Sequence, residues 1–220
     1  MGFFRRISDK LTIVNTRMEH ADGVSLTVRA AFNVVHDEDC DDCIGASALR
    51  KQLERFPEGQ FVALYEDEDA VRVVGSAHTM RTAEPPHPGT WEGTIGNISI
   101  PNHDPNGEWL YGVEMAVRPD YQGFGVGSAL YQARFDLVRR LNLRGWYAGG
   151  MLMGYPRYRD TLSPREYGEK VISGELQDPT VSMQMKRGFV PLEVIEEYME
   201  EKQSGNAAIL ILWSNPDYKD

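Results

Sequence analysis

Three features are scarce in this chain of 220 residues: cysteine, long apolar runs and positive charge. No run approaches the ~18 apolar residues that a membrane-spanning helix needs, and residues 1–10 lack the apolar stretch of a signal peptide. We therefore expect no membrane partner and a cytoplasmic location. The net charge of −10, from 23 Lys and Arg against 33 Asp and Glu, argues against a nucleic-acid partner, because phosphate binding needs clustered positive charge.

The two cysteines, Cys40 and Cys43, form a C-x-x-C spacing with His36 upstream. A zinc site would need a fourth ligand, and a redox pair would need a positive or helix N-terminal setting to lower a thiol pKa. Five carboxylates lie within residues 36–43 instead, and they act in the opposite direction. We expect a surface loop and no metal, with a metal or redox role as the minor alternative.

Hydrophobic periodicity and turn signals divide the chain into strands and helices without a linker or an internal repeat. Predicted strands cover residues 11–15, 60–66, 70–81, 108–117, 145–152, 189–199 and 207–213. Predicted helices cover residues 24–35, 47–56, 126–141, 164–174 and 178–188, the fourth of them starting at the capping box of Ser163 and Glu166. Residues 82–108, rich in proline and glycine, are interpreted as a flap. One mixed α/β sheet of about seven strands, flanked by helices, is the expected architecture.

Three alternating glycines, Gly123, Gly125 and Gly127, lie between a predicted strand and a predicted helix. A Walker loop is excluded because no lysine follows, and a dinucleotide fingerprint fails because Ser128 occupies its last glycine position. Without side chains, the amides from Gln122 to Ser128 can converge on an anion at the positive end of the helix dipole. The segment therefore predicts a phosphate site, and a tight turn without a ligand is the alternative.

The pattern Val117-x-Pro119 followed by Gln122-x-x-Gly125-x-Gly127 and an amphipathic helix resembles the acyl-CoA signature of the GNAT superfamily of N-acetyltransferases. The order of elements is similar over nearly the whole chain, down to a final Gly188-Phe189. Some segments resemble GNAT modules that are fused to carbon-nitrogen hydrolase domains. Since no hydrolase counterpart lies within residues 1–220, we expect a single acyltransferase domain.

The resemblance implies a mostly antiparallel GNAT-like sheet and acetyl-CoA as the co-substrate. It also implies that the strand before the glycines splays from its neighbour to admit the pantetheine arm. The backbones of Met115 and Val117 would bind that arm. The residues that would cradle the pyrophosphate are Gln122, Gly123, Phe124, Gly125, Val126, Gly127 and Ser128.

Acetyl transfer by direct attack needs a base that removes a proton from the amine and a donor that stabilises the oxyanion. Glu114 is the candidate base because a carboxylate is unexpected in the middle of an apolar strand; a salt-bridged rim carboxylate is the alternative. Some family members place their glutamate three positions earlier, which is Tyr111 here. The backbone amide of Val117 or Met115 is the expected oxyanion donor.

The family's usual acid is a tyrosine four residues before the last helix glycine, and this chain has Gln184 there. Tyr147, Tyr155 and Tyr158 are the nearby candidates for the acid, unless solvent protonates the thiolate. Each of these tyrosines is also explained as a packing residue with a polar end.

The acceptor is expected to be a primary amine of a small molecule, and the sequence leaves its charge open. Acidic residues 36–42 would attract a cationic amine, whereas Arg157, Arg159 and Arg165 would bind an acidic acceptor or the coenzyme 3′-phosphate. Two alternatives remain: an acyl-CoA sensor without turnover, and acetylation of a protein amino group. A homodimer is compatible with the sequence.

Overall fold

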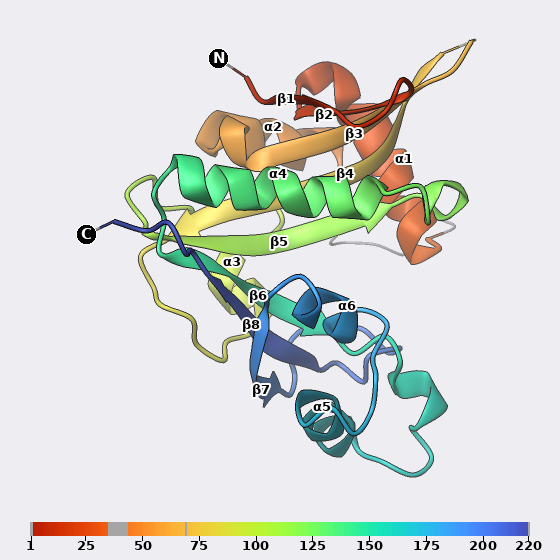
Figure 1. Cartoon of the computed structure of the whole chain (residues 1–220), viewed down its shortest axis with the longest axis vertical. Helices are drawn as coiled ribbons and strands as arrows, with labels where there is room; N and C mark the ends of the chain where they lie inside the picture. The colour runs from red at the N-terminus through yellow and green to blue at the C-terminus, as the bar shows by residue number, and fades with distance from the viewer. Residues whose placement is uncertain (1, 35–43, 69, 220) are drawn as a thin grey trace.

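The structure is a computed structural model that describes residues 2–34, 44–68 and 70–219. These residues build one eight-stranded sheet in the order β1-β2-β3-β4-β5-β6-β8-β7 (Figure 1). The strands are β1 Phe4–Arg6, β2 Leu11–Asn15, β3 Gln60–Glu66, β4 Val71–Thr82, β5 Trp109–Val117, β6 Gly145–Met151, β7 Val190–Ile195 and β8 Ala208–Ser214. All neighbours pair antiparallel except β5 and β6. The mixed, mostly antiparallel sheet expected from the sequence is confirmed.

The additional strand is β1, which the sequence analysis missed. Its three residues pair with β2 from Phe4 opposite Val14 to Arg6 opposite Thr12. A run this short is too brief to show the period-two alternation that identifies a strand. Strand β1 forms one edge of the sheet.

The described helices follow the predicted order, with one addition. They are α1 Ala21–Phe32, α2 Ala46–Arg55, α3 Trp91–Ile95, α4 Val126–Arg140, α5 Pro164–Ile172 and α6 Val181–Met185. The predicted capping box is confirmed: the Ser163 hydroxyl accepts from the Glu166 amide, and the Glu166 carboxylate accepts from the Ser163 amide. The added helix, α3, lies inside the predicted flap. Among the described residues, no helix combines the length and the apolar character needed to cross a membrane.

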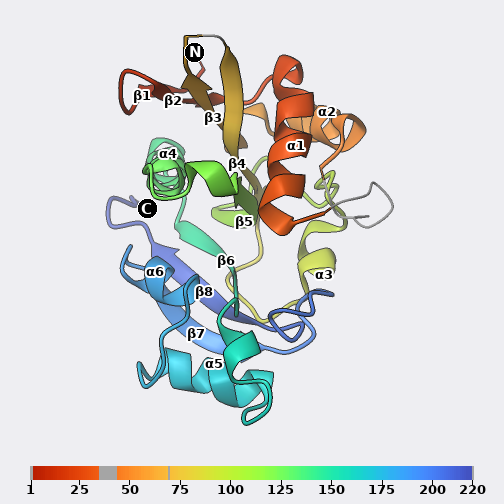
Figure 2. The same ribbon diagram turned by 90° about the vertical axis from the view of Figure 1, so that its right-hand side faces the viewer.

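Helices cover both faces of the sheet (Figure 2). On one face, α1 and α2 bury a cluster that includes Val24, Val28 and Leu49 against β3 and β4. On the other face, α4 packs through Val126 and Leu130 in the main core. The middle of the sheet, β4 and β5, is therefore buried on both sides.

Strands β5 and β6 run side by side for only part of their length. Residues Trp109–Tyr111 pair with Gly145–Tyr147, and beyond these residues the strands diverge (Figure 1). A bulge contributes to the divergence: Glu114 pairs with His78 and Gly112 with Thr79, which leaves Val113 as the extra residue of β5. Bulges bend a strand and increase its twist. The structure thus contains a fork between β5 and β6.

Candidate functional site

The glycine turn lies at the end of β5, where a short 3₁₀ helix, Pro119–Tyr121, leads into α4. Gly123 and Gly125 both have φ of +83°, and a Cβ added at either would have no other heavy atom within 4 Å. These glycines are therefore needed for their left-handed backbone and not for tight packing. The turn leaves its backbone open on the outer side.

The amides of this turn are available to a ligand. Among the described residues, no protein acceptor is found for the backbone amides of residues 123–128. They include the first amides of α4, a helix of 15 residues, whose dipole places partial positive charge at this end. This arrangement can bind an anion such as a diphosphate.

Arg187, which follows α6, brings a full positive charge to the same place. Its Nη2 donates to the Ser128 hydroxyl at 2.8 Å, and its guanidinium lies 5.0 Å from the ring centre of Tyr131. No sequence pattern indicates this position of Arg187, because 59 residues separate it from Ser128. Its position supplements the helix dipole at the start of α4.

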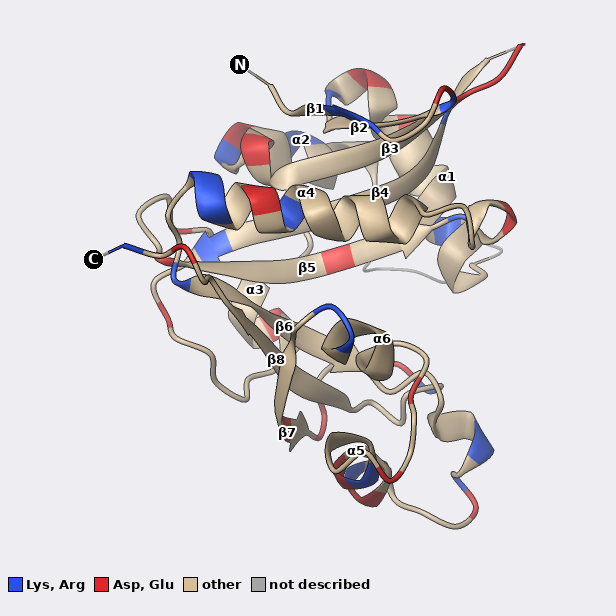
Figure 3. Ribbon diagram, viewed as in Figure 1, with Lys and Arg blue, Asp and Glu red and all other residues tan. Residues whose placement is uncertain are grey.

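Side chains of β5 alternate between the two faces of the sheet. Met115 and Val117 face α4. Met115 contacts Arg134, and the Val117 side chain lies 3.9 Å from the position that a Cβ atom would occupy if Gly127 had a side chain. Glu114 faces the other side of the sheet, where it is the cross-strand neighbour of His78. It is the one acidic residue of β5, which is coloured red in the middle of that strand in Figure 3. Its side chain is partly buried. The predicted base and the predicted pantetheine contacts therefore all lie beside the fork.

His78 is a buried polar residue that the sequence analysis missed. Its Nδ1 donates to the amide oxygens of Gln52, at 2.9 Å, and Gln60, at 3.2 Å. The amide nitrogens of both glutamines donate to backbone carbonyls, so their oxygens are directed at the ring. Burial, assisted by the positive charge of Arg134, lowers the pKa of His78 to about 3. The ring is therefore neutral and presents an unprotonated Nε2.

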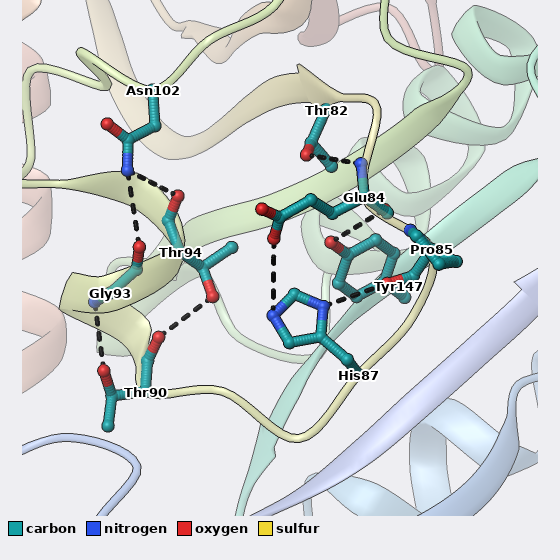
Figure 4. A network of polar contacts seen from close by, with 9 residues as sticks. All are labelled: Thr82, Glu84, Pro85, His87, Thr90, Gly93, Thr94, Asn102 and Tyr147. Carbon is teal, nitrogen blue, oxygen red and sulfur yellow. Dashed lines mark hydrogen bonds and ion pairs between the residues drawn. The ribbon is translucent and has the colours of Figure 1, made fainter.

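Tyr147, a candidate acid, lies at the last paired position of the fork, opposite Tyr111. Its hydroxyl donates to the backbone carbonyl of Glu84 at 3.3 Å, and His87 lies beside the Glu84 carboxylate (Figure 4). Burial and the nearby Glu84 raise the pKa of Tyr147. The phenol therefore keeps its proton in neutral solution.

The predicted flap is anchored on β5 by Trp91 of α3. The Trp91 indole donates to the carbonyl of the bulged residue Val113 at 2.9 Å, and the Trp91 amide donates to the carbonyl of Tyr198. The side chain of Thr90 caps α3 by accepting from the Gly93 amide (Figure 4). Segment 82–108 thus covers the fork on the face opposite α4.

The other expected acids lie further along the chain. Tyr155 is buried, and its hydroxyl donates to the Leu162 carbonyl at 3.1 Å. Gln184, at the position where the family resemblance expects a tyrosine, donates to the hydroxyl of Tyr131 at 3.0 Å. Another phenol, that of Tyr131 on α4, therefore occupies the neighbourhood of this position.

Of the candidate acceptor residues, Arg165 is exposed and ion-paired with Glu196 at 2.7 Å. The cysteines, His36 and acidic residues 36–42 lie outside the described residues. Within residues 2–34, 44–68 and 70–219, no group of three or more His, Cys, Asp and Glu is placed to hold a metal ion.

Comparison with known proteins identifies the family. Residues 27–150 match the model of the acetyltransferase (GNAT) family. The chain is 34% identical over 173 residues to "Uncharacterized N-acetyltransferase YkwB" of Bacillus subtilis (strain 168), covering 78% of this chain and 75% of that protein. The chain therefore belongs to the GNAT acetyltransferase family and is an acyltransferase of the EC 2.3.1 class.

A second relative from the same organism, "Probable hydrolase YhcX", is 36% identical over 173 residues. The match covers 77% of this chain but only 33% of YhcX, so the chain spans about a third of that longer protein. This agrees with the resemblance to GNAT modules that are joined to a hydrolase.

Solved structures support the same fold. A GNAT-like decarboxylase, GphF, in complex with isobutyryl-CoA has a TM-score of 0.74 at 19% identity, covering 92% of this chain and 98% of that one. The loading GNATL domain of CurA from Lyngbya majuscula also reaches 0.74, at 17% identity, covering 94% and 98%. The ribosomal-protein-S18-alanine N-acetyltransferase from Escherichia coli reaches 0.56 at 13% identity, covering 93% of each chain.

Proposed function

We propose that residues 1–220 form one N-acyltransferase domain that transfers an acetyl group from acetyl-CoA to a primary amine of a small molecule. The observation that carries the proposal is the position of the open amides of residues 123–128 directly beside the fork between β5 and β6. A diphosphate held by these amides leaves the attached pantetheine arm next to the unpaired part of β5. The small-molecule acceptor and a cytoplasmic location are predictions from sequence.

In this proposal the coenzyme is held mainly by backbone. The amides of the glycine turn bind the diphosphate, and Arg187 beside Ser128 adds a charge-assisted contact. The turn contributes Gln122, Gly123, Phe124, Gly125, Val126, Gly127 and Ser128. Among the described residues, β5 has no strand partner on the β6 side beyond Tyr111, which supports pairing of the Met115 and Val117 backbones with the pantetheine amides.

The chemistry follows from the placement of Glu114 beside the fork. Its carboxylate removes the proton that an ammonium must lose before it attacks, directly or through a water molecule. A backbone amide of Met115 or Val117 stabilises the oxyanion of the tetrahedral intermediate. The departing thiolate takes a proton from Tyr147 or Tyr155, two of the three candidate acids.

The test measures thiol release from acetyl-CoA with a panel of amines that includes small cationic amines, acidic amines and peptides with free N-termini. We expect release with at least one small amine and calorimetric binding of coenzyme A. Preference for the peptides would show that the acceptor is a protein amino group. Absence of coenzyme A binding would refute the proposal.

One observation favours a second candidate, an acyl-CoA-binding domain without turnover. Gln184 stands where the family resemblance expects the acid, and it cannot donate a proton as a tyrosine does. Tight binding of acetyl-CoA with no thiol release for any acceptor would support this candidate and contradict catalysis.

A further inference from the structure

Arg134 on α4 is a buried cation for which the described part of the chain provides no counterion. Arg134 is only 3% exposed to solvent. Among the described residues, no carboxylate lies within ion-pair distance of its guanidinium. Burial lowers the pKa of Arg134 to about 10, a value at which the group is still charged in neutral solution. A buried charge is costly unless it is paired, so this guanidinium is suited to an anion from outside the chain.

The contacts of Arg134 that the structure shows are with aromatic rings, a carbonyl oxygen and a thioether. The guanidinium carbon lies 4.1 Å from the ring centre of Trp146 and 4.5 Å from that of Tyr131. Nε donates to the Leu130 carbonyl at 3.3 Å, and Nη2 contacts the sulfur of Met115 at 2.8 Å. Aromatic faces and a thioether are weak substitutes for a carboxylate.

These contacts place Arg134 at the fork. Met115 follows Glu114 on β5, and Trp146 precedes Tyr147, the last paired residue of β6. The guanidinium therefore contacts both strands at the point where they diverge, on the α4 face. The Trp146 indole nitrogen is a second buried donor here without a partner among the described residues; it lies 2.9 Å from a Cβ added at Gly112 of β5.

We propose that, beside acetyl-CoA, the fork accepts a donor with an acidic acyl group: a short dicarboxylic acyl-CoA whose terminal carboxylate pairs with Arg134. This inference rests on the proposed function, because it assumes that the thioester reaches the fork. The planar guanidinium can bind a carboxylate through two parallel hydrogen bonds. The Met115 side chain, a flexible thioether, moves aside to admit the acyl group, and the Trp146 indole provides a further donor.

The charge of Arg134 differs in effect from the charges that bind coenzyme A. The open amides of the glycine turn act on every coenzyme A derivative alike, because all derivatives share the same phosphates. Only a contact with the acyl end distinguishes one thioester from another. A difference in affinity between two thioesters of nearly equal shape, one with a charged and one with an uncharged acyl end, therefore measures the effect of Arg134 on the acyl group.

The experiment compares calorimetric binding of coenzyme A, malonyl-CoA and isovaleryl-CoA. The branched end of isovaleryl has nearly the shape of the malonyl carboxylate but carries no charge. We expect the wild-type chain to bind malonyl-CoA roughly tenfold or more tightly than isovaleryl-CoA, the range for a hydrogen bond to a charged group. Arg134→Met should remove this preference, whereas Gly125→Ala, in the glycine turn, should weaken binding of both thioesters by the same factor.

The wild-type comparison decides the matter even if Arg134→Met does not fold. Equal binding of the two thioesters, or tighter binding of isovaleryl-CoA, would overturn the inference while leaving the proposed function intact. Absence of binding for coenzyme A itself would overturn both. Arg134→Lys, which keeps a charge but loses the planar fork, should retain part of the preference for malonyl-CoA.

Discussion

Glu114 lies directly opposite His78 on the β4–β5 ladder, one residue beyond the bulge at Val113. Cross-strand neighbours project from the same face of a sheet, so the carboxylate and the imidazole are neighbours on the face opposite α4. The hydrogen bonds from His78 to Gln52 and Gln60 fix the ring on that face, and burial, assisted by the charge of Arg134, lowers its pKa and keeps it neutral. This pairing places an ionisable carboxylate beside a fixed, uncharged partner at the fork.

Glu114→Gln should lower kcat by about 10²–10⁴-fold, the usual contribution of a general base. The amide has nearly the same shape but cannot accept the amine proton, so the dissociation constant of acetyl-CoA should stay within about twofold of wild type. Steady-state thiol release over a range of pH measures both effects. The acidic limb of the kcat/KM profile should disappear in the variant.

The matched control is Glu108→Gln, at an exposed glutamate just before β5 that pairs with Arg144. This substitution makes the same chemical change on the same segment, and kcat should remain at the wild-type value. An unchanged pH profile in Glu114→Gln would remove Glu114 from the role of base.

Gly125→Ala should weaken coenzyme A binding by at least roughly tenfold, since its Cβ would enter the outer side of the turn where the diphosphate is proposed to bind. Gly174→Ala is the control: Gly174 has φ of +80° and an equally open surrounding, in the loop after α5. A left-handed conformation costs about 1–2 kcal/mol for a residue other than glycine, so both variants should lose similar stability. Equal loss of coenzyme A affinity in the two variants would refute the diphosphate site.

His78 should make the protein less stable in acid. Its folded pKa of about 3 lies below the ordinary value of 6.5, so between these values the unfolded chain binds one more proton than the folded chain. Stability from this residue is complete above pH ~6.5 and should fall by up to ~1.4 kcal/mol per pH unit as the pH drops toward the folded pKa. Urea unfolding of wild type and His78→Gln at several pH values tests this. If the free energy of unfolding of His78→Gln falls with decreasing pH as steeply as that of wild type, His78 is not the source of the acid sensitivity.

Features encoded locally were predictable from sequence, and features that depend on long-range register were not. The capping box of Ser163 and the strand-to-helix turn at Gly125 each depend on a few adjacent residues. The position of His78 opposite Glu114 depends instead on a bulge that shifts the register by one residue, and no local pattern marks it. Arg134 reads as an ordinary helix residue in the sequence; only the packing of α4 on Trp146 shows that its charge is buried.

Tyr147→Phe tests the acid that protonates the departing thiolate. The substitution keeps the ring at the fork, where it packs against Tyr111 and Trp109, and removes only the hydroxyl. If Tyr147 is the acid, kcat should fall by about 10²-fold, the lower end of the range for general acid catalysis, because water can partly replace it. KM for acetyl-CoA should be unchanged.

Tyr155→Phe is the matched comparison, because it also removes one buried hydroxyl that donates to a backbone carbonyl. A loss confined to Tyr155→Phe would transfer the role to Tyr155, while wild-type turnover in both variants would exclude both tyrosines as the acid.

The raised pKa of Tyr147 gives a further criterion. Because the phenol holds its proton well above neutrality, kcat in the wild-type chain should show no alkaline limb near the ordinary tyrosine pKa of ~10, and such a limb would count against Tyr147.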